Sequence, residues 1–306
     1  MSGWTPQDLP DQSGRTVVIT GATSGIGRAA ATELTRVGAH VVLAVRNVEK
    51  GERIAAELGP GAEARPLDLT DLASVRGFAQ AWEGPIDVLI NNAGVMAVPE
   101  GRTKDGFETQ IGTNHLGHFA LTGLLLGHVR GRVVQIASGA HRMGKIDLED
   151  LNWERRTYRR WPAYGQSKLA NLLFVRELQR RLSTAGSPGR AVAAHPGYAA
   201  TELQSRTGNF LQNAAMAVGN KLLAQSGEQG AWPTLFAATQ ELPGGAYIGP
   251  GGPGEMRGSP APASRSSAAR DDVTARELWA LSERLTGVSY AFESSAAAAS
   301  VPSRTA

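Results

Sequence analysis

The sequence predicts an α/β domain built on a doubly wound parallel sheet with helices on both faces. Between residues 16 and 194, short runs rich in Val, Ile and Ala alternate with longer amphipathic segments. Near-continuous apolar strands between helices are typical of a parallel sheet that is covered on both sides. The composition, with 42% hydrophobic and 19% charged residues in 306, is that of a globular protein able to bury one large core.

The first half of the domain is expected to contain four strands joined by three helices. The opening strand is a β-branched run between Gly14 and Gly21, and the helix that follows it stops at Gly38. The later strands are equally apolar, and the later helices carry apolar residues at helical spacing. The expected strands are 16–20, 41–45, 64–67 and 86–90, and the expected helices are 26–37, 49–58 and 72–82.

The second half continues the alternation and adds three irregular segments. We expect helices at 107–128, 161–182 and 272–285, and strands at 132–137 and 191–194. The irregular segments are 142–160, 197–225 and 249–270. The second of them is a candidate helical lid, and the third is rich in Gly, Pro and Ser and predicts an extended surface loop. We therefore expect a flexible N-terminus over 1–13, a single domain over 14–290 with a lid at about 198–225, and a disordered Ala- and Ser-rich tail over 291–306.

Charge and targeting signals exclude several classes of protein. The net charge of +3 is spread along the chain without a long basic stripe, so we expect no nucleic-acid partner. There is no cysteine, which excludes disulfides and a thiolate nucleophile. The polar N-terminus is unlike a signal peptide, and no apolar run is long enough for a membrane span. These features predict a cytoplasmic protein.

A glycine-rich turn joins the first strand to the first helix. It reads Thr20-Gly21-Ala22-Thr23-Ser24-Gly25-Ile26-Gly27. Glycines let the backbone approach a pyrophosphate closely, and the helix N-terminus offers free N–H groups and a partial positive charge. Many turns between strands and helices contain glycine, but this position after the first strand predicts a dinucleotide site.

The end of the second strand discriminates between the two nicotinamide dinucleotides. A carboxylate there binds the ribose 2′-hydroxyl of NAD, whereas an arginine accommodates the 2′-phosphate of NADP. The sequence has Val45-Arg46-Asn47 and no carboxylate before Glu49. Arg46 and Asn47 therefore predict NADP(H), with NAD(H) less favoured; the alternative is that Arg46 is a solvated arginine at a strand end.

Two further strand ends carry polar residues. Asp68-Leu69 ends the third strand, and Asn91-Asn92-Ala93-Gly94 ends the fourth. Open α/β sheets bind ligands at the carboxyl ends of their strands. Each segment could instead be only a turn, but its position favours contact with a cofactor by Asp68, Leu69, Asn92, Ala93 and Gly94.

Tyr164 and Lys168 lie four residues apart in an apolar helical run. Residues at this spacing share one face of a helix. A cation close to a phenol favours the phenolate and lowers its pKa, which brings a tyrosine into the range of acid–base catalysis. A lone pair at this spacing is more often a surface pair, so the interpretation depends on the other motifs.

The ordered set of motifs resembles the short-chain dehydrogenases/reductases over about residues 14–290. It consists of the glycine-rich turn, Asp68, Asn91-Asn92-Ala93-Gly94, Asn114, Ser138, Tyr164 with Lys168, and Pro196-Gly197 with Thr201. Three stretches are similar to the retinol-dehydrogenase-like branch, as is the long gap between Ser138 and Tyr164. They are Thr113-Asn114-His115-Leu116-Gly117-His118-Phe119, Tyr164-Gly165-Gln166-Ser167-Lys168-Leu169-Ala170-Asn171 and His195-Pro196-Gly197.

The resemblance implies a Rossmann-type fold and a set of roles. Tyr164 would be the acid/base, Lys168 would stabilise the phenolate and bind the nicotinamide ribose, Ser138 would bind the substrate oxygen, and Asn114 would hold a water near Lys168. Pro196, Gly197 and Thr201 would shape the nicotinamide site.

These roles imply an NADP(H)-dependent oxidoreductase that interconverts a small lipophilic aldehyde or ketone and its alcohol. The alternatives are the same chemistry with NAD(H) and a non-catalytic dinucleotide-binding sensor or scaffold. Family members often form homo-oligomers through the helices that correspond to those carrying Asn114 and Tyr164. The resemblance makes a homo-oligomer possible here and leaves the oligomeric state open. The histidines match no metal-ligand spacing, and we expect no metal.

Overall fold

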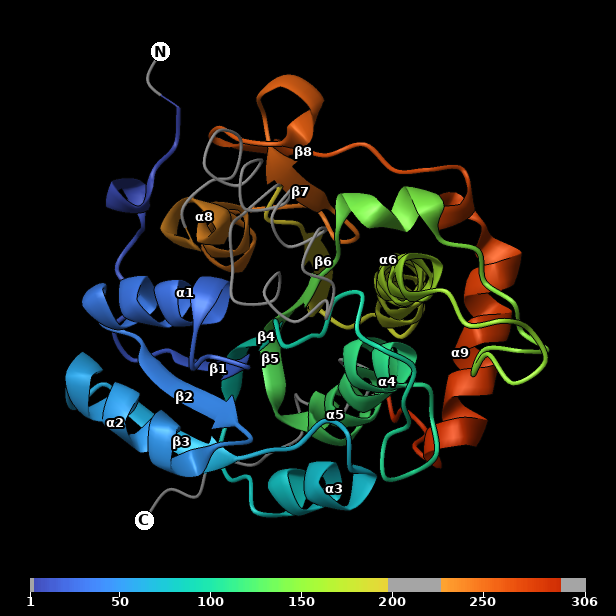
Figure 1. Ribbon diagram of the computed structural model, residues 1–306. Coiled ribbons are helices and arrows are strands. Elements are labelled where there is room, and N and C mark those ends of the chain that lie inside the picture. Colours follow the sequence, from blue (N-terminus) through green and yellow to red (C-terminus); the bar gives the residue numbers. More distant parts are fainter. Residues whose placement is uncertain (1–2, 198–226, 293–306) are drawn as a thin grey trace.

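Eight strands lie side by side in one sheet in the computed structural model, which describes residues 3–197 and 227–292 (Figure 1). The strand order is β3-β2-β1-β4-β5-β6-β7-β8, and all neighbours are parallel except β7 and β8. The strands are Thr16–Thr20 (β1), His40–Val45 (β2), Ala62–Pro66 (β3), Ile86–Asn91 (β4), Val129–Ile136 (β5), Arg190–Ala194 (β6), Tyr247–Pro250 (β7) and Pro260–Pro262 (β8). The order reverses between β1 and β4, so the predicted doubly wound sheet is confirmed.

Helices cover both faces of this sheet (Figure 1). One face carries α1, α2 and α8, and the other carries α3, α5, α6 and α9. Alternate residues of a strand point to opposite faces of the sheet. Val17 and Ile19 of β1 pack in one core cluster, and Val18 packs in the other. The helices are Gly25–Arg36 (α1), Val48–Leu58 (α2), Leu72–Gln80 (α3), Thr109–Ile111 (α4), Gly117–Leu125 (α5), Arg160–Thr184 (α6), Gly227–Thr239 (α8) and Asp272–Thr286 (α9).

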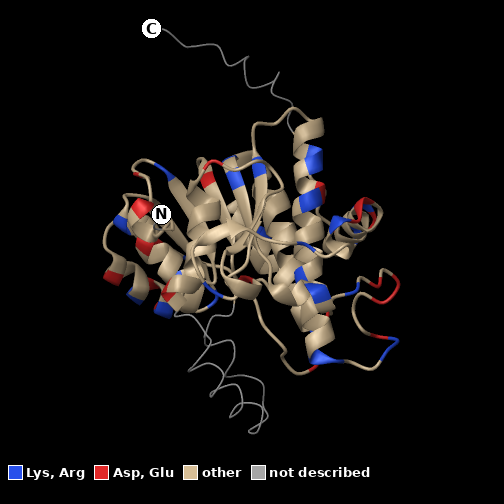
Figure 2. Ribbon diagram, turned by 90° about the horizontal axis from the view of Figure 1, so that it is seen from above, with Lys and Arg blue, Asp and Glu red and all other residues tan. Residues whose placement is uncertain are grey.

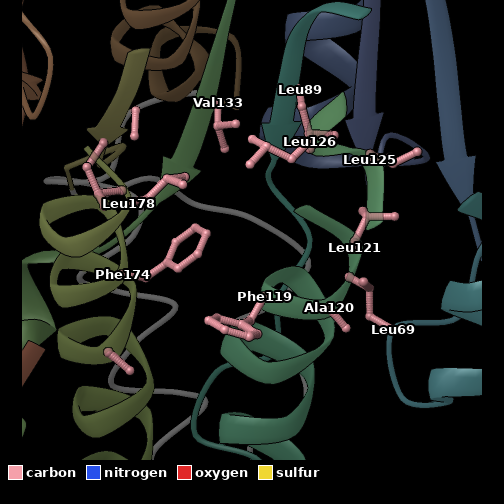
Figure 3. Packing of buried hydrophobic residues seen from close by; sticks show 14 of the residues in the cluster. Leu69, Leu89, Phe119, Ala120, Leu121, Leu125, Leu126, Val133, Phe174 and Leu178 are labelled. Carbon is pink, nitrogen blue, oxygen red and sulfur yellow. The ribbon is translucent and has the colours of Figure 1, made fainter. Parts of the chain in front are cut away.

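Aromatic side chains join α5, α6 and α9 into one layer. Phe119 of α5 lies edge-on to Phe174 of α6, with ring centroids 5.8 Å apart (Figure 3). Trp279 of α9 contacts both rings, at 5.0 Å from Phe119 and 5.8 Å from Phe174. Tyr290 then donates a hydrogen bond of 2.6 Å from its hydroxyl to the carbonyl of Phe119. The helix that carries Tyr164 and Lys168 is thus held by a buried aromatic cluster on the side away from the sheet.

The long helix expected over 107–128 is interrupted. It consists of α4, a π-helical turn at Gly112–Leu116 (η2), α5 and a short 3₁₀ turn at Leu126–His128. Gly117 begins α5 where a Cβ would lie 2.5 Å from the carbonyl oxygen of Leu69, so the chain passes close to the end of β3. A π turn inside a helix often marks a functional site, and this one contains Asn114.

The segment expected to be a surface loop at 249–270 instead contributes to the sheet. It contains the end of β7, a 3₁₀ turn at Pro253–Glu255 (η6) and the edge strand β8. Short strands rich in Gly and Pro show no alternation of apolar residues, so the sequence carried no signal for them. The helix α8, with Pro233 inside it, was also not expected.

The structure describes most of the expected flexible N-terminus, but neither the expected lid nor the end of the chain. Residues 3–13 include a 3₁₀ turn at Pro6–Asp8, and Trp4 lies edge-on to Phe236 at 5.3 Å, so this segment has defined contacts. The expected lid at 198–225 lies outside the described residues, as does the tail from residue 293.

The outer surface mixes both signs of charge. In the view of Figure 2, Lys and Arg are interspersed with Asp and Glu on the outer helices and loops. On α6, for example, Glu177 lies 2.7 Å from both Arg180 and Arg181. Among the described residues, no helix has the length and apolar character that crossing a membrane requires.

Candidate active site

A cavity of about 1030 Å³ opens at the carboxyl ends of the strands. The residues that the sequence placed at the cofactor and at the reaction line this cavity together, apart from Asn114 and Thr201. They are Gly21, Thr23, Ser24, Gly25, Ile26, Gly27, Arg46, Asn47, Asp68, Leu69, Asn92, Ala93, Gly94, Ser138, Tyr164, Lys168, Pro196 and Gly197. Asn114 lies behind the wall of the cavity, and Thr201 lies outside the described residues.

The glycine-rich turn forms a cradle that side chains would fill. Gly21 has φ +68° and Gly25 has φ +53°, values that favour glycine. A Cβ on Gly21 would lie 2.9 Å from Ala93, and one on Gly27 would lie 2.4 Å from Nδ2 of Asn92. The N-cap of α1, Ser24, makes no side-chain cap, so the first N–H groups of the helix are left for a ligand. This geometry fits a dinucleotide pyrophosphate.

The end of β2 brings two cations to the cavity. Arg46 is exposed there, and Lys50 lies one turn into α2. Asn47 caps that helix, because its Oδ1 accepts the N–H of Lys50 at 2.9 Å. Neither cation has an ion-pair partner within residues 3–197 and 227–292. The sequence predicted Arg46 but missed Lys50. An N-cap at Asn47 would have placed Lys50 on the first turn of α2.

Tyr164 and Lys168 lie in the second and third turns of α6 and are almost fully buried, at 8% and 4% exposure. Lys168 donates from Nζ to the carbonyl of Ile136 at 3.1 Å, and Nζ lies 5.8 Å from the centre of the Tyr164 ring. Ser138 lies just past the end of β5, after Ala137, and its hydroxyl oxygen accepts the N–H of Ala140 at 3.2 Å. Acid–base, cationic and hydroxyl groups therefore meet at the end of β5.

The expectation that the pKa of Tyr164 falls below its ordinary value is wrong for this structure. Burial raises the pKa of the Tyr164 hydroxyl to about 12, although a hydrogen bond with the Ser138 side chain acts in the opposite direction. Burial also lowers the pKa of Lys168 to about 8, which reduces its positive charge at alkaline pH. Tyr164 is thus protonated at neutral pH, as a proton donor must be.

The depressed pKa of Lys168 has a measurable consequence for stability. The folded protein releases this proton near pH 8, whereas the unfolded chain holds it to about 10.5, so the unfolded state binds more protons between these values. The free energy of unfolding should therefore rise with pH across this window, by up to about 3 kcal/mol. Urea unfolding of wild type and Lys168→Met at about pH 7 and about pH 10 tests this. The rise should be absent from the variant; equal slopes would show that Lys168 keeps an ordinary pKa.

Asn114 is hydrogen-bonded to the backbone of Val95, which lines the cavity. Its Oδ1 accepts the N–H of Val95 at 2.8 Å, and its Nδ2 donates to the carbonyl of Val95 and to Oγ of Ser167, both at 2.9 Å. A Cβ on Gly94 would lie 3.0 Å from Oδ1 of Asn114 and 3.5 Å from Nζ of Lys168. Asn114 therefore fixes the loop after β4 beside the lysine.

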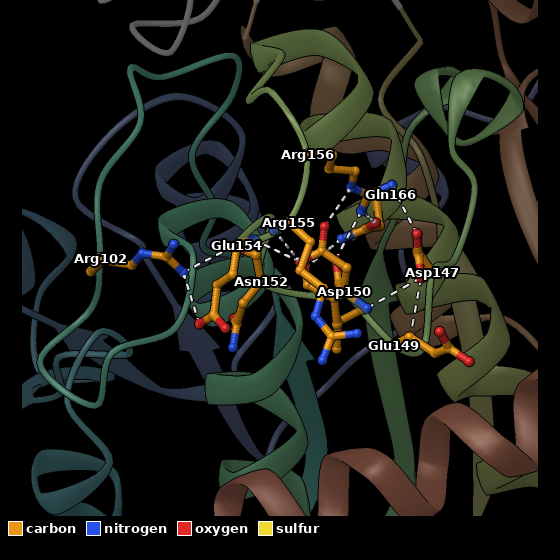
Figure 4. Close-up of polar contacts among 10 residues, drawn as sticks. Arg102, Asp147, Glu149, Asp150, Asn152, Glu154, Arg155, Arg156 and Gln166 are labelled. Carbon is orange, nitrogen blue, oxygen red and sulfur yellow. Dashed lines mark hydrogen bonds and ion pairs between the residues drawn. The ribbon is translucent and has the colours of Figure 1, made fainter.

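The insertion at 142–160 is tied to α6 by its own polar network (Figure 4). Arg156 donates to the carbonyl of Asp150 at 3.0 Å and to Oε1 of Gln166 at 2.7 Å, and it lies 3.6 Å from Asp147. Its guanidinium also stacks 3.8 Å from the ring centre of Trp153. This arginine is committed to the fold and is not available for an acidic substrate.

The lining of the cavity also contains residues that the sequence did not single out. Met143, Trp161 and Met256 are 56%, 38% and 37% exposed, although all are large and apolar, and all line the cavity. Glu255 lies 3.3 Å from Nε2 of His195 and 3.6 Å from Arg142. The loop at 253–256 connects the antiparallel strands β7 and β8, which are short and carry no alternating apolar pattern. In the described part of the chain, no group of three or more His, Asp or Glu is suited to a metal ion.

Known proteins are similar to this chain in sequence and in fold. The profile of the short chain dehydrogenase family matches residues 15–211. The chain is 43% identical over 293 residues to retinol dehydrogenase 13 of Homo sapiens, covering 90% of this chain and 85% of that protein. It is 42% identical over 301 residues to the polyprenol dehydrogenase of Mus musculus, covering 92% and 87%. A crystal structure of an uncharacterised protein from Mycobacterium paratuberculosis has a TM-score of 0.83 and 52% identity, covering 95% of this chain and 100% of that one.

These matches agree with the strand order and with the motifs that line the cavity. The family profile alone covers well over half of the chain. The chain therefore belongs to the short chain dehydrogenase family, in its retinol-dehydrogenase-like branch, and is an oxidoreductase of the class that interconverts carbonyls and alcohols with NAD(P)(H).

Proposed function

We propose that this protein uses NADP(H) in preference to NAD(H) to interconvert a small lipophilic aldehyde or ketone and its alcohol, with Tyr164 as the acid/base. One observation carries the proposal. The buried, protonated hydroxyl of Tyr164 shares a cavity with the glycine-rich cradle, and it hydrogen-bonds with the Ser138 side chain. A proton donor and a second hydroxyl beside a nucleotide site are what reduction of a carbonyl requires.

The places of the side chains in the cavity support the following roles. The nicotinamide, when bound, supplies or accepts the hydride. Tyr164 gives its hydroxyl proton to the carbonyl oxygen in reduction and takes it back from the alcohol in oxidation. Ser138 donates a hydrogen bond to the same oxygen as negative charge develops on it. Lys168 stabilises the tyrosine after proton loss and offers its ammonium to the ribose hydroxyls, and Asn114 keeps the neighbouring loop in place.

A lipophilic substrate is supported by exposed apolar side chains that line the cavity. Met143, Trp161 and Met256 expose apolar area there, and an apolar substrate would cover it. The two named relatives are dehydrogenases of retinol and of polyprenol, both long apolar alcohols. Arg142 lies beside Glu255, so its charge is partly compensated and gives little attraction to a carboxylate substrate.

The direct test is turnover with a panel of aldehydes and alcohols of increasing chain length. Wild-type protein should oxidise NADPH with apolar aldehydes at a rate that rises with chain length, and Tyr164→Phe should not. Turnover of charged or short polar carbonyls alone would contradict the lipophilic substrate class. Turnover in Tyr164→Phe equal to that of wild type would contradict the assigned acid/base.

The preference for NADP(H) is tested at Arg46. An Arg46→Asp variant should raise the KM for NADPH by about 10- to 100-fold, because it removes a charge-assisted hydrogen bond and adds a like charge beside the 2′-phosphate. The KM for NADH should change by less than about threefold. Arg53→Asp is the matched control, since Arg53 pairs with Glu49 on the same helix, outside the cavity. An equal loss with both nucleotides would show that Arg46 does not bind the 2′-phosphate.

A further inference from the structure

His118 is a buried histidine to which the reaction described above gives no role. It lies on the first turn of α5 and is 1% exposed. Its Nδ1 lies 3.1 Å from the backbone carbonyl oxygen of Asn114, and its Nε2 lies 2.9 Å from the hydroxyl oxygen of Thr20. One imidazole thus spans from the end of β1, where the glycine-rich turn begins, to the π-helical turn that carries Asn114.

The surrounding hydrogen bonds fix which nitrogen carries the proton. The carbonyl of Asn114 can only accept, so Nδ1 of His118 must donate. The hydroxyl oxygen of Thr20 already accepts the backbone N–H groups of Asn92 at 3.0 Å and Ala93 at 2.9 Å. Its own proton is therefore directed to Nε2 of His118. Burial lowers the pKa of His118 to about 3, which keeps the ring neutral and in this single tautomer.

The carbonyl that His118 holds belongs to a turn with irregular geometry. In an α-helix, the carbonyl of residue 114 would pair with the N–H of residue 118, but η2 at Gly112–Leu116 is π-helical. The side chain of His118 bonds this carbonyl from within the next turn. The side chain of Asn114 is meanwhile bonded to Val95 and Ser167. Both ends of Asn114 are thus fixed, one by His118 and the other by the loop beside Lys168.

We propose that His118 is a positioning residue, which ties the carbonyl of Asn114 to Thr20 and so couples the glycine-rich turn to the neighbourhood of Lys168. Three segments that are distant in sequence meet at this ring: the end of β1, the end of β4 through Asn92 and Ala93, and the start of α5. An apolar residue would fill the same space without the bonds. The proposal rests on the proposed function for its kinetic effect, but its geometry can be tested without turnover.

The kinetic test uses variants that each keep one of the two bonds. Asn in place of His118 keeps a donor where Nδ1 lies and loses the acceptor for Thr20, whereas Gln keeps a polar atom where Nε2 lies and loses the donor. His118→Leu removes both bonds and should lower kcat by about tenfold, which corresponds to about 1.4 kcal/mol, with less than about a threefold change in the KM for NADPH. His118→Asn should recover more of kcat than His118→Gln.

His115 supplies the matched control. It is a second buried histidine and lies three residues earlier, in the π turn, but its Nε2 lies 3.0 Å from the hydroxyl oxygen of Ser282 on α9. His115→Leu should lower stability and leave kcat unchanged. A wild-type kcat in His118→Leu, an equal loss in both leucine variants, or better recovery by Gln than by Asn would overturn the positioning role.

A measurement on the wild-type protein separates this proposal from the proposed function. Nitrogen-15 shifts of the His118 ring at neutral pH should show a protonated Nδ1 and an unprotonated Nε2. A protonated Nε2, or a doubly protonated ring, would overturn the assignment whether or not the enzyme turns over. If the tautomer is as expected but no carbonyl substrate is reduced, the proposed function fails and the coupling of the two turns remains.

Discussion

A Tyr164→Phe variant is expected to lose about two to four orders of magnitude in kcat, the range that a positioned acid/base contributes. The substitution removes the hydroxyl and leaves the ring, which lies edge-on to Trp161 with centroids 6.1 Å apart. Because the ring stays, no cavity forms and the wall of the site should keep its shape. Binding of NADPH, measured by calorimetry, should therefore change little while steady-state and single-turnover rates fall together.

Tyr290→Phe is the control for removing a buried tyrosine hydroxyl. That hydroxyl bonds the carbonyl of Phe119 in the aromatic cluster, far in sequence from the site. Its loss should lower the free energy of unfolding by about 1 kcal/mol and leave kcat unchanged. If Tyr164→Phe retains its rate within about threefold, another group transfers the proton. If both variants lose activity equally, the effect is one of stability and not of chemistry.

Gly27→Ala is expected to weaken binding of the dinucleotide by about 10- to 100-fold. The added Cβ would lie 2.4 Å from Nδ2 of Asn92 and 2.6 Å from the carbonyl oxygen of Gly21. Relieving these contacts must shift the turn that would hold the pyrophosphate, and overpacking of this kind costs about 1–3 kcal/mol. Calorimetric titration with NADPH measures the loss, and circular dichroism checks that the fold is retained.

Gly77→Ala is the matched control for that substitution. Gly77 is exposed in α3, and a Cβ there would meet nothing within 4 Å. Alanine in a helix interior should raise stability by about 0.5–1 kcal/mol without affecting NADPH binding. Wild-type affinity in Gly27→Ala would mean that the glycine-rich turn does not approach the pyrophosphate as its geometry suggests.

Local patterns made most of the cavity predictable. Gly21, Asp68, Asn92 and Ser138 each follow a strand, and parallel strands end at one edge of a sheet, so their meeting there follows from the topology alone. The spacing of Tyr164 and Lys168 placed both on one face of α6. Lys50 was not predicted, because only the structure shows that Asn47 caps α2 and so places Lys50 near the end of β2.

The features that the sequence did not predict depend on tertiary contacts. Met256 and Glu255 reach the cavity through β7 and β8, strands of four and three residues with no alternating pattern. The π turn around Asn114 depends on close passage beside Leu69 and on the ring of His118. The pKa of Tyr164 was expected to fall, but it rises because the hydroxyl is buried, and burial is set by the whole fold.

The aromatic cluster between α5, α6 and α9 also constrains the order in which this chain can fold during its synthesis. The hydroxyl of Tyr290 bonds a carbonyl 171 residues earlier, and Gly123 on α5 leaves room for the rings of its partners because a Cβ there would lie 2.6 Å from Tyr290. During synthesis, Phe119 and Phe174 leave the ribosome long before α9 exists to cover them. The helix that carries Tyr164 therefore exposes apolar surface that favours association until α9 has been synthesised.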